Sequence, residues 1–259
     1  MVKALSLNIS ELDGPKSNPI DVEYNGDLNL WSRYVAFNHN QESFKFLLDP
    51  MLHNGLEKVS AMGYGNAINA LSDAEGGIAK YFSQKFAQVT NPPLDSIREA
   101  DGMTLRVALG EKPHLGKSRS KQIVIDSPVL STEQFAKLLD QESVPCKKID
   151  ILFEPSSDPN KNEASLLKAL DARSTEAAKF ADEFGGMIIL TDRSISSKMA
   201  AMPLPLVISA VNQKLIEAGL RLKVSVVIDS GQVVSSHQIS CALGFGASAV
   251  HPYLISWRA

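Results

Sequence analysis

Charged and polar side chains gather at the ends of three apolar runs. Asp192 and Arg193 follow the run MIILT, Asp229 and Ser230 follow VSVVI, and His251 follows SAV. Carboxylates, a guanidinium and an imidazole are the groups from which an acid–base or anion-binding site can be built. The same groups could instead pair with one another and cap the helices that follow. Both interpretations stay open at the level of residue types.

The apolar runs predict strands that alternate with helices. Repeated βα units indicate a parallel sheet, and the carboxyl ends of its strands would bring the polar groups to one edge. The units are too few for a closed barrel of eight strands. The predicted fold is α/β, an incomplete (β/α) barrel-like parallel sheet of about five strands preceded by an α-helical N-terminal region. The predicted strands are 121–126, 148–154, 187–192, 224–229 and 248–253, with helices at 131–140, 162–183, 203–218 and 233–243.

The N-terminal half has a different pattern. Residues 1–30 are dense in turn formers and are predicted to be an irregular tail or linker, whereas 31–120 should be a helical part of the domain. The βα repeat at 121–259 would complete that same domain. An apolar stripe runs from Phe44 to Leu52 at steps of three and four residues.

Two capping signals flank a proline corner in this helical part. Ser72 with Glu75 and Ser96 with Glu99 have the spacing of capping boxes. Asn91-Pro92-Pro93 lies between them and should end the first helix, because proline cannot continue a helix. The prediction is a helix to about residue 88, a rigid corner, and a second helix to about residue 110.

Composition narrows the functional classes. The net charge of −3 gives no general attraction to nucleic acid or an anionic membrane, and no apolar run is long enough to cross a bilayer. The two cysteines, Cys146 and Cys241, form no C-x-x-C pair, which argues against a zinc or iron–sulfur site and favours a reducing, cytoplasmic setting. No nucleotide-binding fingerprint and no nucleophile–base pair is found. We therefore predict no cofactor, no metal and no catalytic residue.

Several longer stretches resemble the central region of the large subunit of glutamate synthase. They are AMGYGNAINALSD (61–73), FAQVTNPPLDSIRE (86–99), IDSPVLSTEQF (125–135), the run from ILTDRS to AGLR (189–221) and the run from VSVVID to HPYL (224–254). The motifs occur in the family's order, and the resemblance covers about residues 31–255.

The resemblance implies a fold and a division of labour. The family's large subunit combines an amidotransferase domain, this central domain, a flavin-binding (β/α)8 synthase domain and a β-helix. Its central domain resembles a degenerate barrel, binds no flavin and connects the catalytic domains. The amidotransferase needs a cysteine as its first residue, whereas this chain begins Met1-Val2-Lys3, and two cysteines cannot supply an iron–sulfur cluster. The family's oxidoreductase activity is therefore not expected of this chain alone.

The chain departs from the family pattern at three places. Tyr64 to Ala67 stand where paired acids and a proline are usual, Ser194 stands where a glycine is usual, and His251 replaces an asparagine. Asn91 of the proline corner and Arg98 are retained. We therefore expect Asn91 and Arg98 to face a partner, and any contact made by the lost acids to be altered.

Three functional hypotheses follow. The first is a non-catalytic linking subunit of a glutamate synthase-type complex, serving glutamate biosynthesis and nitrogen assimilation beside separate amidotransferase and FMN synthase subunits. It predicts an exposed apolar patch. The second is a stand-alone regulatory module that holds a small anion at Asp192, Arg193, Asp229 and His251. The third is an independent enzyme using that pocket. An excised piece of a longer polypeptide is also open, and the oligomeric state is not predicted.

Overall fold

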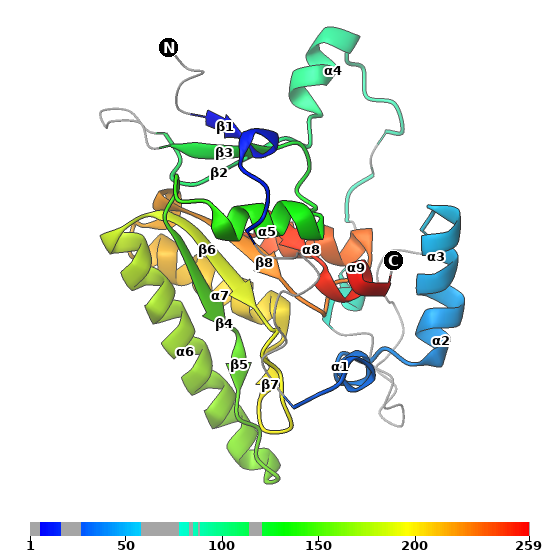
Figure 1. Cartoon of the computed structure of the whole chain (residues 1–259), viewed down its shortest axis with the longest axis vertical. Coiled ribbons are helices and arrows are strands. Elements are labelled where there is room, and N and C mark those ends of the chain that lie inside the picture. The colour runs from blue at the N-terminus through cyan, green and yellow to red at the C-terminus, as the bar shows by residue number, and fades with distance from the viewer. Residues whose placement is uncertain are drawn as a thin grey trace.

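A four-stranded parallel sheet forms the centre of the computed structural model, which describes residues 6–16, 27–57, 78–82, 85–87, 89–113 and 121–258. Its strands are β4 (Cys146–Asp150), β6 (Gly186–Thr191), β8 (Val224–Asp229) and β9 (Ala249–His251), and they lie side by side in that order. Figure 1 labels the first three of them. The pairing aligns the last residues of the strands, so Asp150, Thr191, Asp229 and His251 form one row at the carboxyl edge.

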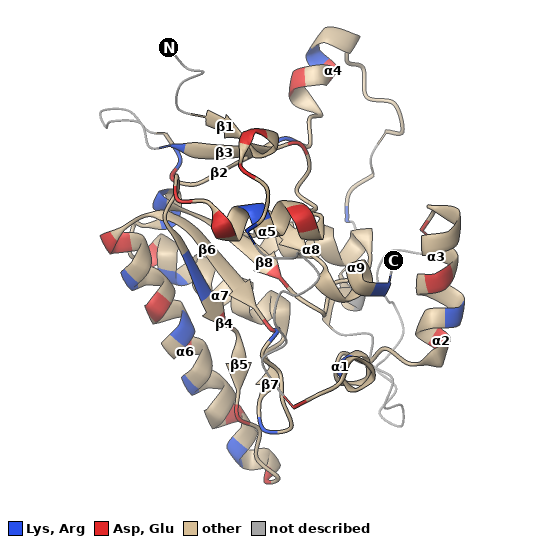
Figure 2. Cartoon of the chain, viewed as in Figure 1, with Lys and Arg blue, Asp and Glu red and all other residues tan. Residues whose placement is uncertain are grey.

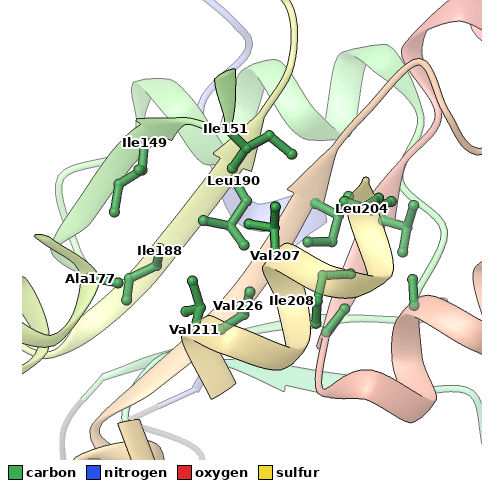
Figure 3. Close-up of a cluster of buried hydrophobic side chains, with 14 of the residues drawn as sticks. Ile149, Ile151, Ala177, Ile188, Leu190, Leu204, Val207, Ile208, Val211 and Val226 are labelled. Carbon is green, nitrogen blue, oxygen red and sulfur yellow. The ribbon is translucent and has the colours of Figure 1, made fainter. Parts of the chain in front are cut away.

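The connecting helices cover one face of this sheet. They are α6 (Pro159–Glu183), α7 (Leu204–Glu217) and α8 (Ser236–Phe245). Alternate strand residues such as Ile188 and Leu190 pack against Val207 and Val211 of α7 (Figure 3). Strands that follow one another in the chain are neighbours in the sheet, as in a (β/α) barrel. The described residues nevertheless form an open sheet and no closed barrel.

A second layer packs on the opposite face. It consists of α5 (Thr132–Asp140) and a three-stranded sheet ordered β1 (Ser6–Asn8), β3 (Gln122–Ile125), β2 (Val107–Leu109). The core here is formed by buried side chains of both layers, which are Ile9, Leu109, Ile123, Ile125, Leu130, Phe135, Leu138, Val144, Met187, Ile189, Val227 and Ala249. Strands β6 and β8 are buried along their whole length because both faces of the central sheet are covered.

The predicted alternation of strands and helices is confirmed, but the predicted membership of the central sheet is wrong in two places. The run 148–154 is divided, because β4 ends at Asp150 and Leu152–Phe153 form a separate strand that pairs outside the central sheet. The run 121–126 forms β3, which pairs parallel with β1 and antiparallel with β2 rather than joining the central sheet. Its residues alternate between half-buried and buried, the pattern of a strand covered on one face. The predicted tail 1–30 also contributes a strand, because β1 supplies the parallel partner of β3.

The helical prediction for residues 72–110 needs correction. Residues 78–81 form a 3₁₀ helix and 85–87 are not helical, while the Ser72 and Glu75 signal lies outside the described residues. Helix α4 spans Ser96–Gly102 and ends well before residue 110. The chain then forms β2, because pairing with β3 outweighs local helix preference. The N-cap of α4 is Asp95 rather than Ser96, since its carboxylate accepts from the N–H groups of Ile97 and Arg98.

The N-terminal helices pack across the carboxyl edge of the sheet. They are α1 (Leu30–Ala36), α2 (Gln41–Ser43), a π-helix (Phe44–Leu48) and α3 (Asp49–Asn54), and they meet the C-terminal helix α9 (Tyr253–Arg258). The predicted apolar stripe is confirmed where Phe44 and Leu48 join Tyr34, Tyr253 and Leu254 in a third core cluster. Two short strands, β5 (Leu152–Phe153) and β7 (Ala200–Ala201), pair antiparallel beside this region. Within the described ranges, no helix combines the length and apolarity needed to cross a membrane.

We predict that Gly186→Ala destabilises the fold much more than Gly219→Ala. Both glycines have positive φ, +99° and +70°, which a Cβ disfavours. A Cβ on Gly186 would also lie 2.2 Å from the carbonyl oxygen of Pro145, whereas a Cβ on Gly219 meets nothing within 4 Å. The expected losses are roughly 2–5 kcal/mol and roughly 1–2 kcal/mol. Chemical denaturation of both variants checks this, and equal losses would contradict the close β4–β6 approach.

Candidate functional site

The polar groups predicted to meet at the strand ends do come together. Asp229 and His251 are aligned across β8 and β9, and Asp192, Arg193 and Ser230 follow directly after strands β6 and β8. All five residues are buried, with at most 1 % of their surface exposed. The sheet register explains this meeting, because parallel strands end at a common edge.

The carboxylate of Asp229 is the centre of one cluster. Its Oδ2 accepts hydrogen bonds from Nε of Arg193 at 2.6 Å and from the hydroxyl of Thr191 at 2.8 Å. Its Oδ1 accepts from Nη2 of Arg193 at 3.0 Å and lies 2.8 Å from Nδ1 of His251. A carboxylate only accepts, so this geometry assigns the proton of the imidazole to Nδ1. Burial would raise the pKa of Asp229, but the hydrogen bond from His251 and the charge of Arg193 lower it to about 2.

Aromatic rings enclose the Arg193 guanidinium of this cluster. Its Cζ lies 4.5 Å from the ring centre of Tyr253, 5.2 Å from that of Trp257 and 5.8 Å from that of Phe135. The imidazole of His251 stacks on Phe135 with ring centres 4.5 Å apart. A cation over aromatic faces is stabilised where water is excluded. The ion pair is therefore built into the core, where its charges neutralise each other.

Asp192 organises a second cluster in the adjacent loop. Its Oδ2 accepts from the hydroxyl of Ser230 at 2.5 Å and from Nε2 of Gln232 at 3.2 Å, while Oδ1 accepts from the N–H of Gly231 at 3.0 Å. Gln232 in turn accepts at 3.0 Å from the N–H of Leu204, where α7 begins. Burial raises the pKa of Asp192 to about 6, although the donors from Ser230 and Gly231 oppose that shift. This carboxylate fixes the loop after β8 to the start of α7.

The N-terminal helices close the strand-end edge. Nη1 of Arg33 in α1 donates to the carbonyl of Arg193 at 2.5 Å, and the hydroxyl of Tyr34 donates to the carbonyl of Leu254 at 3.2 Å. Gly231 leaves room for this packing, since a Cβ there would lie 2.6 Å from atoms of both Phe37 and Leu254. In βα proteins this edge is where ligands usually bind. Here helix and side-chain contacts cover the charged groups at this edge.

Asn91 and Arg98 do not belong to this cluster. Both are exposed, and α4 with its preceding loop projects away from the central sheet (Figure 1). Arg98 pairs with Asp95 in the first turn of its own helix. The structure therefore leaves Asn91 and Arg98 accessible on a protruding corner.

Sequence reasoning missed two residues at the closed edge. Arg33 is buried and bonds to the main chain of Arg193, and His39 is buried with Nε2 3.4 Å from the carbonyl of Gly231. The available signal was the position of Arg33 and His39 within the aromatic stretch WSRYVAFNH. If such a stretch packs into the core, its arginine and histidine are buried too, and charged groups are buried only when they are paired.

Neither a metal centre nor an activated thiol occurs among the residues that the structure describes. No group of three or more His, Cys, Asp or Glu side chains is arranged to hold a metal ion there. Burial raises the pKa of the Cys146 thiol to about 11 and also raises that of Cys241. Nε2 of His237 lies 3.7 Å from Cys241 Sγ, but it is only 2.7 Å from the carbonyl of Ala79, to which it donates. That nitrogen cannot act as the base for the thiol.

We predict that Asp192→Asn changes the pH dependence of stability in a defined direction. Because the pKa of Asp192 is about 6 in the folded protein against an ordinary 3.8, the folded state retains a proton that the unfolded state releases. This carboxyl group therefore makes stability fall as the pH rises from about 4 to about 6. Measured by urea unfolding across this range, the stability of Asp192→Asn relative to the unchanged protein should rise with pH. A constant or falling difference would contradict the raised pKa.

The comparisons of this sequence with known proteins agree on one family. The sequence matches the glutamate synthase central domain family over residues 32–259. It is 35% identical over 231 residues to the glutamate synthase [NADPH] large chain of Bacillus subtilis, covering 87% of this chain and 15% of that protein. It is 34% identical over 225 residues to the chloroplastic ferredoxin-dependent glutamate synthase of Spinacia oleracea, covering 85% and 14%. The chain spans about a seventh of the length of these relatives. With nearly all of its residues matched, the chain belongs to the glutamate synthase central domain family.

Proposed function

We propose that this chain is a non-catalytic linking unit that joins the amidotransferase and flavin synthase parts of a glutamate synthase, in the cytoplasm. In this proposal its role in glutamate biosynthesis is to position those parts, either as a separate subunit or as a segment of a longer polypeptide. It keeps the incomplete barrel-like winding of strands and helices, but the charged groups at the edge where such folds usually hold a ligand are buried and bonded to one another.

The distribution of exposed apolar side chains carries this proposal. Among the residues that the structure describes, fourteen of the twenty exposed large apolar side chains lie between Leu30 and Leu105, although residues 121–258 include more than twice as many described positions. Phe86 and Ile97 are 83% and 82% exposed. Such a concentration is unfavourable in water and is typical of a surface that a partner covers.

The distribution of charged residues also distinguishes the loop before α4 from the surface of the βα part. Figure 2 shows that residues of both signs occur along α6, as expected of a helix that faces water, whereas the loop before α4 is almost uncharged. That loop contains Asn91 and the proline corner, and α4 carries Arg98. We infer that α4 and the proline corner contact a catalytic part of the synthase.

The small-anion alternative has no observation in its favour. An anion would need access to Asp192, Arg193, Asp229 or His251, and each is at most 1% exposed. Their charged atoms also bond to one another and to neighbouring groups. We therefore make no second functional proposal on these residues.

We predict that Ile97→Asp weakens assembly with the amidotransferase and synthase units of the same cell. The substitution places a charge on the 82% exposed Ile97 of α4, where a partner would have to bury it unpaired. The expected effect is at least about tenfold weaker binding, the equivalent of about 1.4 kcal/mol. Light scattering after size exclusion of mixtures of the separately purified units measures it.

The matched control is Leu167→Asp on α6, which removes a 54% exposed leucine from a helix surface already rich in charge. It should assemble like the unchanged chain. If the unchanged chain forms no complex with either unit, or if both variants behave alike, the linking proposal is wrong.

A further inference from the structure

A cavity of about 670 Å³ lies between the N-terminal helices and the βα part. Its wall combines Phe37, His39 and Leu47 from the N-terminal side with Met199, Leu204 and Val233 from the loops and helix starts beyond the strands. The strand-end ion cluster is a separate feature, because none of its five residues lines this space. The volume is within the range of about 300–1,000 Å³ that is usual for small-molecule pockets.

The described lining of the cavity carries no fixed charge. It contains no Lys, Arg, Asp or Glu, and most of its side chains are apolar. Two glutamines on the wall already hold the protein main chain: Gln232 accepts from the N–H of Leu204 at 3.0 Å, and Gln238 accepts from that of Val234 at 2.8 Å. The cavity therefore offers mainly an apolar surface.

Among the described residues of this wall, His39 is the titratable one. It is 7% exposed, and burial lowers the pKa of its imidazole, so the ring is neutral at physiological pH. Its Nε2 lies 3.4 Å from the carbonyl of Gly231, which assigns the proton to Nε2 and leaves Nδ1 as an acceptor. The charged groups near this ring are held elsewhere, since Asp192 bonds to Ser230 and Gly231 and Arg33 bonds to the carbonyl of Arg193.

We propose that this cavity binds a small, uncharged, largely apolar molecule. An anion or cation entering it would lose water without meeting an opposite charge on the described wall, and that loss is costly. An apolar molecule gains by leaving water and needs few polar contacts. This inference goes beyond the linking role and stands independently of it.

Such a ligand would touch both parts of the domain at once. Residues 36–47 come from the N-terminal helices, whereas Met199, Leu204 and Val233 come from the βα part. Because binding stabilises only the state in which both parts are docked, occupancy should raise the unfolding temperature by mass action.

The test uses two dyes that differ mainly in charge, neutral N-phenyl-1-naphthylamine and its anionic sulfonate analogue 8-anilinonaphthalene-1-sulfonate. Fluorescence titration of the whole chain should give one saturable site for the neutral dye and a rise in Tm. The sulfonate should bind at least about tenfold more weakly, because its charge finds no partner. No saturable binding of the neutral dye, or tighter binding of the sulfonate, would overturn the proposal.

Two further measurements locate the site. Ala36 lines the cavity and is itself exposed, so Ala36→Trp should fill the space and weaken dye binding at least about tenfold. Ala164→Trp on the exposed side of α6 should leave it unchanged. In the unchanged protein, the ¹³C-methyl NMR signal of Met199 should shift on titration and that of the exposed Met103 should not. Equal binding by both tryptophan variants, or a Met199 signal that does not move, would refute this location.

Discussion

The buried ion pair between Asp229 and Arg193 is the constraint around which the carboxyl edge is built. Each charge needs the other at this depth, because an unpaired ion in the interior costs several kcal/mol. The pair takes its geometry from the sheet, since the register aligns Thr191, Asp229 and His251. The aromatic rings around Arg193 and the stacking of His251 on Phe135 then exclude water from it. These contacts use the groups that could otherwise have served a substrate.

Closure of this edge connects the fold to the proposed role. The N-terminal helices pack where the loops of a βα enzyme usually surround a substrate, and Arg33 and Tyr34 bond directly to main-chain atoms there. What the chain exposes instead is apolar surface on its N-terminal part and a projecting α4. A domain closed at its edge and apolar on its outer surface is suited to holding other domains in place. The neutral cavity between the N-terminal helices and the βα part differs in its chemistry from the ion cluster.

The sequence was sufficient for the βα repeat and for the meeting of Asp192, Arg193, Asp229, Ser230 and His251, because continuous apolar runs and their polar ends are local signals. It could not reveal that these groups form hydrogen bonds and an ion pair with one another, because those contacts depend on strand register and side-chain geometry. The run 121–126 could be recognised as a strand, but its partners β1 and β2 could not. In particular, β2 lies in a segment that the sequence pattern assigned to a helix. Arg33 was missed because its partner is a main-chain carbonyl 160 residues away along the chain.

The most direct test of this account is a double-mutant cycle on Asp229 and Arg193, with unfolding free energies measured for Asp229→Asn, Arg193→Gln and the combined variant. Each single change leaves a buried charge without its partner, so each should cost about 3–5 kcal/mol. The double variant should lose much less than the sum of the two, because it leaves neither charge behind. Additive losses, or single losses below about 1 kcal/mol as for surface ion pairs, would contradict a closed and internally paired strand-end edge.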